Sequence, residues 1–257
     1  MYLDVVDLRN FYAQPLGIMT RRLLGRAVRS RFDNVSGLRV LGLGYATPYL
    51  GAFREEAERC IAVMPAAQGV VRWPSAGAAL ATLADETMLP LPTASMDRVI
   101  AVHALEMTAD AGAMLQEVWR VLAPGGRLLA AVPNRRGVWA RIDATPFGNG
   151  RPFSRGQVIR LLREALFTPV GWSEALYAPP SSWFLRTAPA WERVGSGLAL
   201  PFSGVLVVEA TKQLYRPAPI RRTRLAPVLE PVLEPALAPG AVPAGRVAAG
   251  VGGQVSP

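Results

Sequence analysis

Cysteine and histidine are almost absent from this 257-residue chain, which holds one of each, Cys60 and His103. A lone cysteine cannot form a disulfide within the chain, and one histidine with one cysteine cannot build a zinc site with the usual spacing. We therefore expect a reducing compartment and no metal site. Cys60 falls in an apolar stretch, where a thiol behaves as a small hydrophobic group.

Long apolar runs are also missing, since no stretch reaches the roughly 20 residues that cross a bilayer. The first residues lack the basic and apolar regions of a signal peptide, so we expect no transmembrane segment and a cytoplasmic protein. Neither the phosphate-binding pattern G-x-x-x-x-G-K-[ST] nor the nucleophile elbow G-x-S-x-G occurs. These absences exclude the common nucleotide triphosphatases and α/β-hydrolases.

Lysine is nearly missing too: Lys212 is the only one among 28 basic residues, and the formal net charge is +9. Arginine enrichment with almost no lysine is typical of a GC-rich genome, so a nucleic-acid partner is not expected. The alternative is a positive surface that attracts an anionic ligand or a membrane face. A helix predicted over residues 16–32 carries five of these arginines, on a face that is either solvated or in contact with an anion or membrane.

Apolar strand patterns alternate with helical ones along the chain, which favours an α/β fold with a mostly parallel sheet and helices on both faces. We expect an N-terminal helical cap over residues 1–35, a main domain over 36–216, and a flexible proline- and alanine-rich tail over 217–257. The remaining helices are expected at 50–59, 110–122 and 154–166, and the strands at 38–43, 59–64, 78–83, 96–102, 127–132, 169–177 and 204–211.

Three segments carry a family resemblance: VLGLGYATP at residues 40–48, DETMLPLP followed by SMDRVI at 85–100, and LQEVWRVLAPGGRL at 115–128. In this order they resemble the class I S-adenosylmethionine-dependent methyltransferases, over roughly residues 36–211. The resemblance implies a Rossmann-like, doubly wound sheet of seven strands with the last strand antiparallel. It also implies S-adenosylmethionine as cofactor and methyl transfer as activity.

The same resemblance assigns the cofactor-binding positions. Asp85 is similar to the carboxylate that accepts a hydrogen bond from the adenine amino group, with Glu86 beside it. His103, at the end of the fourth strand, matches the wall between cofactor and acceptor. The methionine and ribose parts would lie over Gly42, Gly44, Tyr45, Ala46 and Met64.

Two of these positions depart from the family pattern. Gly42 stands where an acid is usual, and Met64 stands where the second strand normally offers an acid to the ribose hydroxyls. Each lost carboxylate removes a charged acceptor worth about 1.5–3 kcal/mol. The alternative to an enzyme is therefore a methyltransferase-like fold without catalysis that serves as a binding or regulatory partner.

The acceptor side is predicted from the few polar groups near the strand ends. His103 is a candidate base or orienting group, or else a structural histidine. Tyr12, Asn134 and Arg135 are candidate substrate contacts, and residues 137–153 have the composition of a lid. Seven arginines between 135 and 163 favour a small or acidic acceptor, although a solvated surface, a protein partner or a homodimer explains them equally well.

Overall fold

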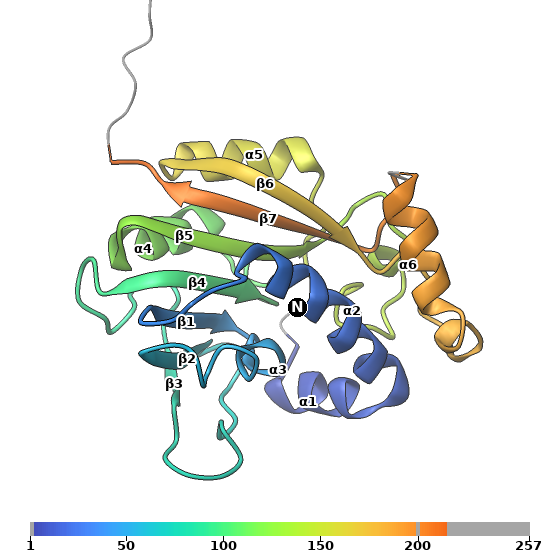
Figure 1. The fold of residues 1–257 in the computed structure, drawn as a ribbon, viewed down its shortest axis with the longest axis horizontal. Helices are drawn as coiled ribbons and strands as arrows, with labels where there is room; N and C mark the ends of the chain where they lie inside the picture. Colours follow the sequence, from blue (N-terminus) through green and yellow to red (C-terminus); the bar gives the residue numbers. More distant parts are fainter. Residues whose placement is uncertain (1–2, 199–200, 215–257) are drawn as a thin grey trace, which may run out of the picture. The chain divides into compact units, whose positions relative to one another are not determined.

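A computed structural model describes residues 3–198 and 201–214, and the tail predicted over 217–257 lies outside the described residues. Seven strands form one sheet in the order β3-β2-β1-β4-β5-β7-β6 (Figure 1). The strands are β1 (Arg39–Gly44), β2 (Arg59–Pro65), β3 (Ala81–Ala84), β4 (Met96–Val102), β5 (Leu122–Pro133), β6 (Phe167–Ala175) and β7 (Val205–Lys212). The helices are α1 (Val5–Ala13), α2 (Pro15–Arg31), α3 (Thr47–Leu50), α4 (Ala111–Val121), α5 (Arg155–Glu164) and α6 (Ala188–Gly197), with short 3₁₀ turns η1 (Trp139–Arg141) and η2 (Ser182–Leu185).

The sheet confirms the predicted fold class. Strands β3, β2, β1, β4 and β5 pair in parallel, whereas β7 runs antiparallel to both β5 and β6. Parallel neighbours need crossover connections, which carry the chain over the faces of the sheet. The carboxyl ends of β1 to β5 consequently meet at one edge, where ligands bind in open α/β sheets.

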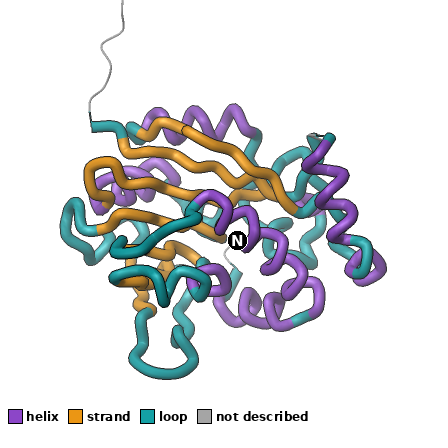
Figure 2. The backbone as a smooth tube through the Cα atoms, viewed as in Figure 1, coloured by secondary structure: helices purple, strands orange, loops and turns teal. Residues whose placement is uncertain are grey.

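Each face of the sheet is covered by its own apolar cluster, and helices and strands form separate layers in Figure 2. Along β1, Val40 packs in the cluster that holds Leu24 of α2, while the next residue, Leu41, packs in the one that holds Val118 of α4. This alternation follows from the two-residue period of a strand. It fixes which strand residues face α1 and α2 and which face α4 and α5.

The helix predicted over 50–59 is wrong, because α3 is a single turn and residues 51–58 are turns. Leu50 and Phe53 are buried in the same cluster as Leu24 and Val28 of α2. The long helix α2 therefore covers apolar surface that a longer α3 would need. The connection from β1 to β2 consequently places only the N-terminus of a short helix at the edge of the sheet.

Strand boundaries also differ from the predictions at two places. Strand β3 begins at Ala81 rather than residue 78, and β5 begins at Leu122 rather than 127. The Pro124-Gly125-Gly126 sequence ends α4 as expected but lies within β5, where the register against β4 shifts between Met96 and Arg98. Gly125 has a φ of +73°, which accommodates this irregularity.

Helices α1 and α2 meet at a sharp junction of Gln14, in an extended conformation, and Pro15. Pro15 begins α2, where its missing N–H costs nothing. Gly17 lies so close to α1 that a Cβ there would be 2.0 Å from the Phe11 carbonyl oxygen. This close approach holds α1 at the edge of the sheet where β1, β2 and β4 end.

Candidate functional site

The carboxyl ends of β1 and β4 pack closely against each other at one edge of the sheet. Gly44 has a φ of +76°, and a Cβ there would lie 2.4 Å from the Val102 carbonyl oxygen. Only glycine fits this position, because it combines a left-handed conformation with no side-chain volume. The first residue after β4, His103, also has a positive φ of +50°. Backbone strain of this kind concentrates at functional sites.

His103 is fully buried and lies at the centre of a hydrogen-bonded chain. Its Nε2 lies 2.9 Å from the Tyr12 hydroxyl of α1, and its Nδ1 lies 3.2 Å from Glu106 Oε1. A neutral imidazole has one donor and one acceptor, so Nδ1–H donating to the carboxylate leaves Nε2 to accept from a hydroxyl. This arrangement of carboxylate, imidazole and hydroxyl is capable of holding or accepting a proton at Nε2.

Aromatic rings surround the His103 imidazole and the Tyr12 phenol. The ring of Tyr12 stacks on Tyr45 with centroids 5.6 Å apart, and its hydroxyl lies 2.9 Å from the Tyr49 hydroxyl. Phe147 lies 4.7 Å from the imidazole on the other side. We name the rings of Tyr45, Tyr49 and Phe147, together with the His103 imidazole, the aromatic box. Burial raises the pKa of the Tyr12 hydroxyl well above its usual value, and Tyr49 adds to this shift.

Helix α1 is tied to the loop after β2 as well as to His103. The Val5 amide donates to the Gln68 carbonyl at 2.8 Å, and Gln68 Nε2 donates to the His103 carbonyl at 2.9 Å. Within the described part of the chain, Gln68 Oε1 and Glu106 Oε2 are buried without a hydrogen-bond partner. Such unpaired buried acceptors are rare and costly, which marks this place as one adapted to something other than stability.

The positions assigned to the cofactor are closely packed in this arrangement. A side chain at Gly42 would meet Leu50 Cδ1 at 2.5 Å, so the Leu50 side chain would have to move before an acid could stand where the family usually has one. Met64 is fully buried and accepts a weak hydrogen bond from the Val71 amide. Tyr12 fills the space beside Tyr45 and His103. The residues present, as folded here, do not accommodate an adenosyl group with its methionine arm.

Asp85 and Glu86 lie at the exit of β3 but are not equally placed. Asp85 is exposed and accepts from the Thr87 amide and hydroxyl, and these bonds lower the pKa of its carboxyl. Glu86 is buried and accepts from the Thr108 hydroxyl in the loop that follows His103. The loop after β3 therefore contacts the loop after β4, as the resemblance implies, and the Asp85 carboxylate is exposed at the surface.

The predicted substrate contacts separate into two groups. Tyr12 reaches His103, whereas Asn134 donates to the Ser203 hydroxyl and Arg135 donates to the Pro152 carbonyl.

The predicted lid is anchored by buried Trp139 and Phe147, whose rings contact each other edge to face. Two residues that sequence reasoning did not select, Tyr49 and Gln68, lie at the site together with Glu106 and Phe147. The spacing of Glu106, three residues after His103, was the one available signal.

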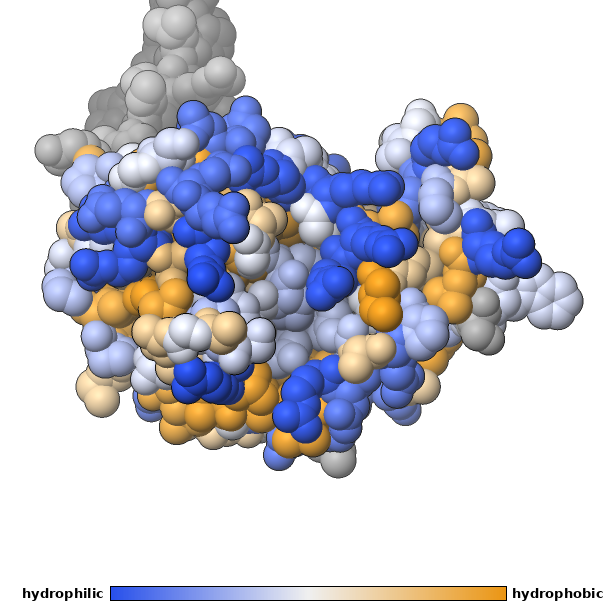
Figure 3. Space-filling view, turned by 60° about the horizontal axis from the view of Figure 1, so that its bottom comes forward, coloured by the Kyte–Doolittle hydropathy of each residue, from blue (hydrophilic) through white to orange (hydrophobic). Residues whose placement is uncertain are grey.

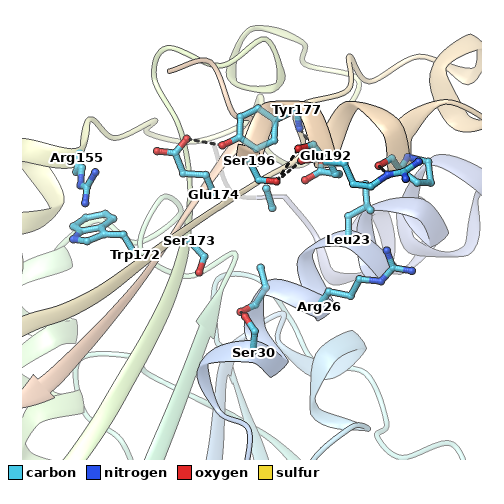
Figure 4. Close-up of a pocket in the computed structure, with 14 residues that line it drawn as sticks. Leu23, Arg26, Ser30, Arg155, Trp172, Ser173, Glu174, Tyr177, Glu192 and Ser196 are labelled. Atoms are coloured by element: carbon cyan, nitrogen blue, oxygen red, sulfur yellow. Dashed lines mark hydrogen bonds between the residues drawn. The ribbon is translucent and has the colours of Figure 1, made fainter. Parts of the chain in front are cut away.

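A cavity of about 700 Å³ lies between α2, β6 and α6, away from the carboxyl ends of β1 and β4 (Figure 4). Arg26 and Leu23 of α2 line one side, and Glu174 of β6 accepts from the Tyr177 hydroxyl at 3.2 Å on the other.

Figure 3 shows strongly hydrophilic residues spread over one face with apolar residues among them. All seven arginines between 135 and 163 are exposed.

Neither a membrane-spanning helix nor a metal-binding cluster is found among the described residues. No helix among them combines the length and apolarity that crossing a membrane requires. No group of three or more histidine, cysteine, aspartate or glutamate residues is placed to hold a metal ion.

Comparison with known proteins identifies the class. Residues 40–130 match the family described as methyltransferase domain, and this range includes His103 and all three segments of the resemblance. Together with the strand order, this match makes residues 40–130 similar to the class I S-adenosylmethionine-dependent methyltransferases, and S-adenosylmethionine is the cofactor of that class.

Two curated relatives are similar over part of their length. The malonyl-[acyl-carrier protein] O-methyltransferase of Alcanivorax borkumensis is 40% identical over 75 residues, 27% of this chain and 25% of the relative. The demethylmenaquinone methyltransferase of Thermus thermophilus is 31% identical over 129 residues, 49% of this chain and 51% of the relative. The chain thus spans about a quarter and about half of these relatives.

A solved structure supports the fold. In the complex between the Haloferax volcanii Trm112 methyltransferase activator and a putative methyltransferase, the matched chain has a TM-score of 0.61 and 19% identity. The alignment covers 83% of this chain and all of that one. A likeness at this identity shows the architecture alone.

Proposed function

We propose that this chain transfers a methyl group from S-adenosylmethionine to a small acceptor, and that α1 must leave the carboxyl edge of the sheet before the cofactor enters. The observation that carries this proposal is the match of residues 40–130 to a methyltransferase domain, with Gly44 held against the β4 exit at His103. S-adenosylmethionine supplies an activated methyl group, so the protein has to contribute chiefly positioning.

The acceptor is proposed to be small, with an anionic group as the favoured case. The exposed arginines that follow β5, Arg135 and Arg136 first among them, supply positive charge next to the strand exits. Both curated relatives are named as methyltransferases, and their names state a malonyl thioester carrier and demethylmenaquinone as acceptors. Neither acceptor is assigned to this chain, because the matches cover only part of those proteins.

A second function is favoured by the filled site. Tyr12 fills the space beside Tyr45 and His103, and both family acids are replaced, at Gly42 and Met64. A methyltransferase-like protein that binds or regulates a partner without catalysis would keep α1 closed at all times. A solved relative forms a complex with an activator protein, so a partner for this chain is also a prediction.

Calorimetric titration with S-adenosylhomocysteine separates the two functions. For the enzyme we expect weak binding to the wild-type chain and several-fold tighter binding to Tyr12→Ala, because the variant no longer fills the site and the cost of opening α1 falls. Asp85→Ala should weaken binding about tenfold, which corresponds to the loss of one charged hydrogen bond.

The matched control is Asp33→Ala, which removes an exposed carboxylate after the C-terminal end of α2 and should bind like the wild type. An absence of heat at millimolar ligand in both the wild type and Tyr12→Ala would reject the enzyme and leave the binding protein. Equal binding by Asp85→Ala and Asp33→Ala would remove Asp85 from the cofactor site.

A further inference from the structure

The Tyr12 side chain occupies the aromatic box as a ligand would. It comes from α1, 91 positions before His103 in the sequence, and its hydroxyl meets both His103 Nε2 and the Tyr49 hydroxyl at 2.9 Å. Its ring is stacked on Tyr45 and lies edge-on to Tyr49. The other rings and the imidazole thus form a flat apolar slot with a polar end.

We propose that this slot is a binding site for a hydroxyl-bearing aromatic ring, a phenol or its larger relatives, which takes the place of the Tyr12 ring. As the acceptor site of a methyltransferase it rests on the proposed function, whereas the binding itself does not. The ring of the ligand would lie on Tyr45, and its hydroxyl would take the position of the Tyr12 hydroxyl between His103 and Tyr49.

The polar end of the slot selects for a hydroxyl group. With Nδ1–H donating to Glu106, the Nε2 of His103 needs a donor, and the Tyr49 hydroxyl lies at the same end of the slot. An aromatic ring without a hydroxyl would leave Nε2 buried and unpaired, a loss comparable to one hydrogen bond. Recognition of this kind distinguishes a phenol from a plain arene of the same shape.

The surroundings of the slot provide a second, independent indication of a ligand. Glu106 Oε2 and Gln68 Oε1 are completely buried, and among the described residues neither has a partner. Both side chains touch His103, through its Nδ1 and its carbonyl oxygen. Two unpaired acceptors beside one imidazole suit a ligand with further donors, rather than Tyr12, which reaches neither.

The junction between α1 and α2 permits the exchange. Gln14 is the one extended residue between the two helices, with φ −81° and ψ 159°, and it makes no side-chain cap. A change in its backbone angles would carry Tyr12 out of the slot without unfolding either helix. Movements absorbed by one or two residues between rigid elements are the usual form of a hinge.

The experiment uses the full chain with Tyr12→Ala and two probes, 4-methylphenol and toluene, with no cofactor present. The first probe has the shape of the removed side chain, and the second lacks only its hydroxyl. We expect 4-methylphenol to bind Tyr12→Ala and raise its Tm, with an affinity about fivefold above that of toluene, the value of one ordinary hydrogen bond. Tyr12→Phe, which keeps a ring in the slot, should bind both probes more weakly than Tyr12→Ala.

Equal binding of the two probes to Tyr12→Ala would overturn the proposal, as would equal binding of 4-methylphenol to Tyr12→Phe. If Tyr12→Ala does not fold, hydrogen exchange of the wild-type α1 amides at millimolar probe replaces it. Faster exchange with 4-methylphenol than with toluene supports displacement of Tyr12, and identical exchange refutes it. Because no S-adenosyl compound is used, these results are independent of the calorimetric test of the enzyme.

Discussion

Alkaline pH should destabilise this protein steeply, because two phenols are buried side by side. The pKa of both Tyr12 and Tyr49 is raised, in each case chiefly by burial, whereas in the unfolded chain a tyrosine ionises near pH 10. Above pH 10 the unfolded state therefore loses protons that the folded state retains. The stabilisation is complete below pH 10 and falls as the pH rises toward the folded pKa values.

The size of the effect follows from proton linkage. Each tyrosine that stays protonated lowers the free energy of unfolding by about 1.4 kcal/mol per pH unit above 10, so the pair lowers it by about 5 kcal/mol at pH 12. A loss of this size equals the lower end of the stability of an ordinary domain. We expect urea unfolding followed by circular dichroism to show a flat stability from pH 7 to 9 and a steep decline above pH 10.

Tyr12→Phe provides the control. At pH 8 the variant should be less stable by about 1–3 kcal/mol, since His103 Nε2 loses its buried hydroxyl partner. Above pH 10 its stability should fall about 1.4 kcal/mol per unit more slowly than that of the wild type, because one ionising group is gone. The two curves should consequently approach each other between pH 10 and 12. Parallel curves over this range would show that Tyr12 is not held as a buried neutral phenol.

Three further predictions concern packing. Gly17→Ala should lower the free energy of unfolding by about 1–3 kcal/mol, because the added Cβ would collide with the Phe11 carbonyl. The same variant should show faster hydrogen exchange of the α1 amides, and unchanged exchange would contradict the tight junction between α1 and α2. Gly204→Ala should lower Tm measured by differential scanning fluorimetry, since its Cβ would lie 2.4 Å from Trp139 Cδ1; an unaltered Tm would show that this ring has room to move. Burial raises the pKa of Cys60 to about 11, so iodoacetamide at pH 8 should label the folded chain at least about a hundredfold more slowly than the urea-unfolded chain, and comparable rates would mean an accessible thiolate.

Much of the architecture was readable in the sequence because it depends on local chemistry. Asp110 caps α4 by accepting from the Ala113 amide, and Ser154 begins α5 with a capping box, as the positions of these residues predicted. Continuous apolar runs fixed the buried parallel strands β1, β2 and β4 to within a residue or two. The number of strands in the sheet and the antiparallel β7 followed from the family resemblance.

The site depended on contacts that no local pattern encodes. The sequence placed Gly44 and His103 at neighbouring strand ends, but it did not indicate that Tyr12 would reach the imidazole from 91 positions away. The helix predicted over 50–59 failed for the same reason, since its apolar residues were needed under α2. Helix and strand signals arise from neighbouring residues, whereas the partner of a buried hydroxyl is decided only when all the elements pack together.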